Sequence, residues 1–276
     1  MAEQTSAAAE VAPAKTSPTR DIATIVAIAI VAFAIANVLH EGAGHGGTCV
    51  LTGGHARVLS TVHFDCDRDN RLVAAGGTLV NFIAGFLCWL TLRAVNPARP
   101  RLRYFLWLLM TINLLQACGY FLFSGVGNIG DWAYVVHDLA PAWLWRVGLT
   151  IFGALSYTLA VWLALRELRP FLGERDRRRG GAKDLTILPY LTGGILYTVA
   201  GMFNPVGMVL VGMSAAAASF GGTSGLAWMT QYLRSKFVPK IASPPFTLQR
   251  SVGWMVAAII TAAIFIGVLG RGVRFP

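Results

Sequence analysis

The sequence predicts an all-α polytopic membrane protein with six or seven transmembrane helices. Of its 276 residues, 55% are hydrophobic and only 13% are charged, roughly half the charged fraction of a typical soluble domain. The hydrophobic residues gather in uncharged runs that approach the roughly 20 residues a helix needs to cross a bilayer. Eight tryptophans and 30 glycines supply interfacial anchors and close-packing positions. This composition argues against a water-soluble enzyme and excludes a disordered chain, a collagen-like fibre and a coiled coil.

Six runs are apolar and long enough to be predicted as spans. They are residues 22–39, 72–92, 104–123, 147–165, 185–203 and 252–269. A further stretch, 206–220, is short and rich in glycine, alanine and serine, so it predicts either a seventh span or a re-entrant segment. Residues 1–21 are rich in Ala, Ser, Thr and Pro and are predicted to form a disordered tail rather than a cleaved signal peptide.

The placement of basic residues predicts the orientation. The loops after the second and fourth runs carry most of them: Arg93, Arg99, Arg101 and Arg103, then Arg166, Arg169, Arg175, Arg177, Arg178, Arg179 and Lys183. By contrast, 125–139 has no Lys or Arg, and the three arginines of 40–71 are offset by acids. Because basic loops stay in the cytoplasm, both basic loops and the N-terminus are predicted to be cytoplasmic. The net charge of +10 predicts contact with anionic membrane lipids and no nucleic-acid partner.

Ionisable residues gather at the end of the first apolar run. His40, Glu41 and His45 lie there, where such groups are costly unless they have partners. Asp131 follows the third run, so two spans return the chain to the same membrane face. Two imidazoles and a carboxylate with an open fourth position are what catalytic zinc requires, and a further carboxylate can act as general base. Position alone is equally consistent with a solvated helix end and, for Asp131, with a helix N-cap.

The second run carries a seam of small residues. Gly77, Asn81 and Gly85 are spaced four apart, so they share one helix face on which a neighbouring backbone can approach closely. The amide of Asn81 then points into the bundle. A functional contact and a purely structural interhelical hydrogen bond both fit this motif.

Together these motifs resemble those of the site-2-protease-type membrane zinc metallopeptidases. Their order is His-Glu and His within 40–45, Thr-Gly-Gly-His-Ala-Arg-Val at 52–58, Gly-Gly-x-x-x-Asn at 76–81 and Gly-Asp-Trp at 130–132. The resemblance covers roughly 22–138. It implies a three-helix metallopeptidase-like core over 22–140, followed by additional transmembrane helices over 141–276.

The resemblance also implies a site and a substrate. It implies Zn²⁺ ligands at His40, His45 and Asp131, a general base at Glu41, and an Asn81 that contacts the substrate backbone. The substrate is expected to be a peptide or a transmembrane protein that is hydrolysed in or near the bilayer. A membrane-associated β-hairpin is expected over 51–64, and an extended substrate could pair with its edge near 55–64.

The spacing of the histidines departs from the family pattern. The family has His-Glu-x-x-His, whereas three residues separate Glu41 from His45 here. On an ideal α-helix, residues five apart point about 140° away from each other. We predict that a π-bulge, made easy by Gly42 and Gly44, returns both histidines to one face. The alternative is that Glu41 and His45, which are four apart, bind a metal in a protein without peptidase activity.

Two further departures concern the third ligand and the membrane face. Around Asp131 the family's Asn-x-x-Pro…Asp-Gly is replaced by Gly-Asn-Ile-Gly-Asp-Trp. The charge bias places the metal site toward the non-cytoplasmic face, while many family members act near the cytosolic face.

A loop outside the cytoplasm can hold a disulfide, so Cys49 and Cys66, which flank the expected hairpin, are predicted to be able to pair.

A second class of function fits the same sequence. The chain could be a non-catalytic membrane metal-binding scaffold or a small-solute transporter, for which the interrupted Gly/Ala-rich segment 204–225 is the supporting feature. No feature of the sequence specifies an oligomeric state.

The orientation can be tested by cysteine labelling. A membrane-impermeant maleimide added to intact cells should label Arg57→Cys, because 40–71 is predicted to lie outside, and should not label Arg178→Cys. The two variants control for each other. Labelling at position 57 only after the cytoplasmic side is exposed would overturn the orientation.

Overall fold

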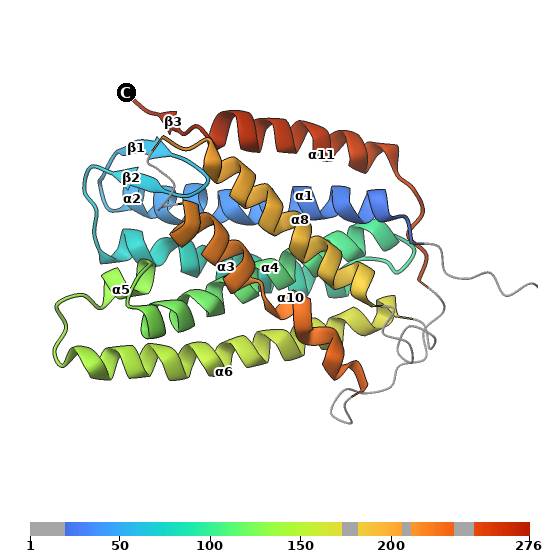
Figure 1. Ribbon diagram of the computed structural model, residues 1–276, viewed down its shortest axis with the longest axis horizontal. Coiled ribbons are helices and arrows are strands. Elements are labelled where there is room, and N and C mark those ends of the chain that lie inside the picture. The colour runs from blue at the N-terminus through green and yellow to red at the C-terminus, as the bar shows by residue number, and fades with distance from the viewer. Residues whose placement is uncertain (1–19, 173–181, 206–210, 235–245) are drawn as a thin grey trace, which may run out of the picture.

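A computed structural model describes residues 20–172, 182–205, 211–234 and 246–276. Within these ranges, six helices are long and apolar enough to cross a membrane, and they form an elongated bundle (Figure 1). They are Ile22–Leu51, Arg71–Ala94, Pro100–Gly127, Ala142–Phe171, Lys183–Met202 and Val252–Leu269. The prediction of a mostly helical protein with six helices long and apolar enough to span a membrane is therefore confirmed.

The core of the bundle is built around α4 (Pro100–Gly127). This helix packs against α1 (Ile22–Val38), α3 (Arg71–Ala94) and α6 (Ala142–Leu168). Two of its polar aromatic side chains donate hydrogen bonds to backbone carbonyls of neighbouring helices. The Tyr104 hydroxyl donates to Leu185 O at 3.0 Å, and Trp107 Nε1 donates to Ala164 O at 2.9 Å. The buried hydroxyl and indole N–H are thus hydrogen-bonded in an interior that offers no water.

The first span is longer than predicted. After α1 the chain continues as a π-helix, η1 (Leu39–Gly46), and then as α2 (Gly47–Leu51). The helix extends beyond the predicted span 22–39, because i→i+5 bonding keeps the backbone paired through the polar residues. The helix ends only before Gly53, whose φ of +80° leaves the helical region.

A small sheet covers the end of the bundle where η1 lies. Strands β1 (Ala56–Leu59) and β2 (Phe64–Cys66) form an antiparallel hairpin whose register pairs Leu59 with Phe64. Its turn is closed by Ser60, whose hydroxyl donates to His63 O at 2.8 Å. The hairpin begins later than the predicted 51–64, because 47–51 is helical.

A third strand in this sheet was not predicted. Strand β3 (Val273–Arg274), near the C-terminus, pairs antiparallel with the outer edge of β1, which gives the order β2-β1-β3. The backbone N–H of Phe275 extends the pairing by donating to Arg57 O at 2.9 Å. The edge of β1 that was expected to be open to a substrate is therefore occupied by the chain itself.

The helices after residue 141 are part of the same packed unit as the expected three-helix core. Helices α8 (Lys183–Met202) and α11 (Val252–Ile264) both pack on α1. Short elements complete the described chain: α5 (Asp131–Val135), η2 (Arg169–Phe171), η3 (Val211–Gly222), α10 (Gly225–Trp228), η4 (Met229–Arg234) and η5 (Phe265–Leu269). Of the possible seventh span, 206–210 lies outside the described residues, and 211–220 belongs to the π-helix η3.

Charged residues differ between the two ends of the described bundle. At the end that carries the sheet, the arginines Arg57, Arg68, Arg71, Arg146, Arg271 and Arg274 are matched in number by the acids Glu41, Asp65, Asp67, Asp69, Asp131 and Asp138. At the opposite end, the basic residues Arg20, Arg93, Arg99, Arg101, Arg103, Arg166, Arg169, Lys183 and Arg250 outnumber the acids Asp21, Glu167 and Asp184. This asymmetry is the basis of the predicted orientation, which stays a prediction.

Cys49 and Cys66 are joined in a disulfide, as predicted, with their Cα atoms 6.1 Å apart. The bond ties α2 to β2 across 17 positions of the sequence. Both cysteines are buried, and Val73 packs with them to form a small apolar cluster beneath the hairpin.

Breaking this disulfide should loosen the hairpin and leave the bundle intact. A closed loop of about 15 residues contributes roughly 3 kcal/mol through the unfolded state, so Cys66→Ser should lower the thermal unfolding midpoint and expose 53–70 to protease. Cys118→Ser, at a free buried cysteine, is the matched control. Non-reducing digestion that yields only free thiols at 49 and 66 would contradict the assignment.

Candidate metal centre

The π-helix η1 brings His40 and His45 together. Their Nε2 atoms lie 3.3 Å apart and their rings are perpendicular, with centroids 4.8 Å apart. Residues five apart face the same way in a π-helix, because its turn is about one residue longer than that of an α-helix. The predicted bulge is confirmed, and the structure pairs His45 with His40 rather than with Glu41.

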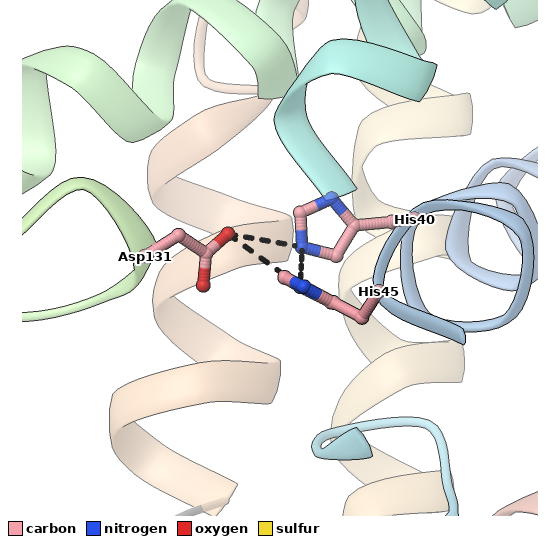
Figure 2. Close-up of side chains that lie close together, drawn as sticks. All are labelled: His40, His45 and Asp131. Atoms are coloured by element: carbon pink, nitrogen blue, oxygen red, sulfur yellow. Dashed lines mark hydrogen bonds and ion pairs between the residues drawn. The ribbon is translucent and has the colours of Figure 1, made fainter. Parts of the chain in front are cut away.

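Asp131 completes the group from the other side. Its Oδ2 lies 3.4 Å from His40 Nε2 and 3.7 Å from His45 Nε2, so three candidate ligand atoms converge on one point (Figure 2). The chain enters α5 through Gly130, which has a φ of +85° and is itself the N-cap. Asp131 is the first residue of the helix, so its carboxylate faces the histidines instead of capping.

The three residues could hold a metal ion. All three offer one ligand atom within a common cluster, and both histidines are buried. His45 Nδ1 lies 2.7 Å from Val73 O, which can only accept, so Nδ1 carries the proton and Nε2 presents its lone pair. Within the described residues, Asp131 Oδ2 is buried and has no hydrogen bond, a cost that a bound cation would offset.

The electrostatics of Asp131 also suit a cation. Burial raises the pKa of its carboxyl, but the neighbouring His40 and His45 together lower it by more, so the pKa lies below its ordinary value. The carboxyl is therefore ionised at neutral pH, the form in which it binds metal.

Glycines on α3 make room for the two imidazoles. A Cβ atom on Gly77 would lie 2.6 Å from both His40 Cε1 and His45 Nε2, and one on Gly76 would lie 2.5 Å from Gly44 O. Further along, a Cβ on Gly85 would lie 2.7 Å from the Leu114 side chain of α4. The close approach predicted from the small-residue seam is therefore confirmed at Gly77 and Gly85.

Glu41 and Asn81 occupy different surroundings. Glu41 is 6% exposed, lies next to His40 on η1, and interacts electrostatically with His45 and Asp131. Asn81 is fully buried and donates from Nδ2 to Gln116 Oε1 on α4 at 3.2 Å. The interhelical hydrogen bond that the sequence left open is thus present, while Asn81 Oδ1 has no hydrogen-bond partner among the described residues.

Sequence reasoning missed Tyr120. Its ring stacks on His40, with centroids 4.7 Å apart and planes 19° from parallel. An aromatic residue inside an apolar run is indistinguishable from ordinary core. The available signal was its spacing of four from Gln116, which places both on one face of α4.

His55, His137 and a second cluster of possible metal ligands do not join the site. His55 pairs with Asp67 and His137 with Asp138, both at exposed positions. Cys49, Cys66 and Asp67 also lie close together, but the two cysteines are disulfide-bonded and offer no thiolate.

The comparisons with known proteins identify no relative. No protein-family model matches the chain, and no curated protein and no solved structure matches it.

A methyl group at Gly77 should disable the site. Gly77→Ala places a Cβ where the imidazoles lie, so we expect loss of bound metal, measured by elemental analysis of the purified chain. Gly148→Ala is the control, because a Cβ there meets nothing within 4 Å. Metal retained at the wild-type level in Gly77→Ala would show that the histidines can move aside.

Proposed function

We propose that this chain is a membrane-embedded zinc metallopeptidase that hydrolyses peptide bonds in or near the bilayer. The observation that carries the proposal is the convergence of His40, His45 and Asp131 beside a further carboxylate, that of the buried Glu41. Ionisable residues within a helical bundle are costly, so such a group indicates a functional site.

The spacing of the candidate ligand atoms supports zinc. Zn–N bonds of 2.0–2.1 Å in a tetrahedron place neighbouring ligand atoms about 3.3–3.4 Å apart. The three separations here are 3.3, 3.4 and 3.7 Å. A set of three protein ligands, as His40, His45 and Asp131 would provide, is typical of catalytic rather than structural zinc. Zinc bound there would polarise the substrate carbonyl and lower the pKa of a water molecule.

Glu41 is the proposed general base. Its carboxylate accepts the proton of the attacking water and then passes it to the leaving amine. Because Glu41 is buried next to the ligands, bulk water competes little for that proton. The stacked ring of Tyr120 holds the plane of His40 during this step.

Asn81 is proposed to contact the substrate backbone through its carbonyl oxygen. One Nδ2–H is engaged by Gln116, so the unpaired Oδ1 is the group free to accept a backbone N–H.

Substrate access is proposed to involve the sheet. Because β3 pairs with the outer edge of β1, an extended substrate that pairs with β1 must displace Val273–Arg274. Two residue pairs and the hydrogen bond from Phe275 N–H to Arg57 O join this segment to β1, so a longer substrate strand could replace it. The transporter alternative is less well supported, because the described part of its interrupted segment packs against α4 and α8.

Exchanging Glu41 for its amide tests the proposal. Glu41→Gln should leave zinc content nearly unchanged and reduce hydrolysis of a peptide substrate by about 10²-fold to 10⁴-fold, the contribution of a general base. His40→Ala and Asp131→Ala should lose both zinc and hydrolysis. Zinc is measured by elemental analysis and hydrolysis by product release.

Two results would contradict the assignment. If Glu41→Gln loses zinc as completely as His45→Ala, then Glu41 is a ligand and a metal-binding scaffold is the better description. If Glu41→Gln keeps full hydrolysis, the general base is another group.

A further inference from the structure

Polar side chains form a layer next to the metal centre, deeper in the bundle. Asn37, Asn81, Gln116 and Tyr197 come from α1, α3, α4 and α8, and each is at most 7% exposed. Asn37 lies three residues before His40 and Gln116 four before Tyr120, so these positions are about one helical turn from the site. Buried polar groups in a membrane bundle are costly, which indicates that this polar layer serves a purpose.

Hydrogen bonds run through the polar layer in one direction. The carbonyl of Phe33 can only accept, so Tyr197 donates its hydroxyl to it at 2.8 Å. Tyr197 then accepts from Gln116 Nε2 at 3.4 Å, and Gln116 Oε1 accepts from Asn81 Nδ2 at 3.2 Å. The acceptor at the end of the chain therefore fixes the orientation of both amides.

A small cavity separates the polar layer from the metal centre. Its volume is about 10 Å³, and its polar lining is Asn37, His40, Thr61, Gln116, Tyr120 and Tyr197. That volume accommodates one water molecule, and a buried water needs two to four polar partners. Thr61 is 3% exposed, and its Oγ1 has no hydrogen-bond partner among the described residues.

His40 also lacks a partner that a metal ligand needs. His45 gives its Nδ1–H to Val73 O, whereas His40 Nδ1 is buried without a hydrogen bond in the described part of the chain. The nearest position on α3 is Gly77, which has no side chain to offer. Metal-binding histidines almost always donate their second N–H to a carboxylate, a carbonyl or a water molecule.

We propose that this cavity is the binding site of one ordered water molecule that accepts the Nδ1–H of His40. Thr61 and Gln116 hold the water, and Tyr197 holds Gln116, so Gln116 is a positioning residue for the metal ligand. The water keeps His40 in the tautomer whose Nε2 lone pair faces the metal. This inference rests on the proposed metal centre.

The affinity for Co²⁺ and Zn²⁺ tests this role. In the full-length chain purified in detergent, Gln116→Met removes the amide at similar length, and Thr61→Val removes the hydroxyl. Each should weaken metal binding by about 10-fold to 100-fold, the usual effect of losing an outer partner of a ligand. The visible absorption bands of bound Co²⁺ should also shift in Gln116→Met, because His40 is no longer held in one orientation.

Asn113→Leu and Tyr190→Phe are the matched controls. Asn113 is a buried amide on the same helix as Gln116, and among the described residues its Nδ2 donates to Leu109 O of that helix. Tyr190 is on α8 and donates to Phe220 O. Neither lines the cavity, so both variants should bind metal like the wild type. Thermal unfolding of every variant is compared to separate a local effect from general destabilisation.

Three outcomes would overturn the inference. Wild-type affinity in both Gln116→Met and Thr61→Val removes the water site and leaves the proposed peptidase standing. An equal loss in Asn113→Leu shows that any change in helix packing weakens the site. A wild-type chain that binds neither ion removes the metal centre itself, and the inference falls with it.

Discussion

The close approach of two backbones, η1 and α3, is the constraint on which the candidate site depends. Gly44 of η1 faces Gly76 and Gly77 of α3, and a side chain at any of the three would separate the helices. The space beside Gly77 is filled by the imidazoles of His40 and His45. One turn earlier on α3, the carbonyl oxygen of Val73 accepts a hydrogen bond from His45 Nδ1. One helix thus provides both the room and the hydrogen bond that aim the histidines.

The π-helix η1 satisfies two requirements at once. In a bilayer every backbone N–H and C=O must find a partner within the protein, and i→i+5 bonding achieves this without ending the helix. The same wider turn aligns residues five apart, so His40 and His45 converge despite their spacing. Four glycines at 42, 44, 46 and 47 reduce the steric crowding of this conformation. The π-helix therefore compensates for a five-residue spacing that would point the two histidines apart on an α-helix.

Distant parts of the chain contribute to the surroundings of the site. Tyr197 of α8 closes the polar layer by bonding Phe33 O of α1, and β3 covers the edge of β1. The helices after residue 141 therefore support the arrangement of the first three. Within the network each hydrogen-bonded member orients the next, because Tyr197 fixes the amide of Gln116 and Gln116 fixes the amide of Asn81.

The sequence by itself determined the features that depend on local pattern and on parity. Hydrophobic runs located the six spans, two intervening spans returned Asp131 to the face of His40 and His45, and glycines beside a displaced histidine indicated a π-bulge. The tertiary structure alone decided that Tyr120 stacks on His40, that Asn81 bonds Gln116, and that Val273–Arg274 joins the sheet. These contacts join segments far apart in the chain, and an apolar run looks the same whichever neighbour it faces. Hydrophobic periodicity shows which face of a helix is buried, but the packing of the helices determines which neighbour that face contacts.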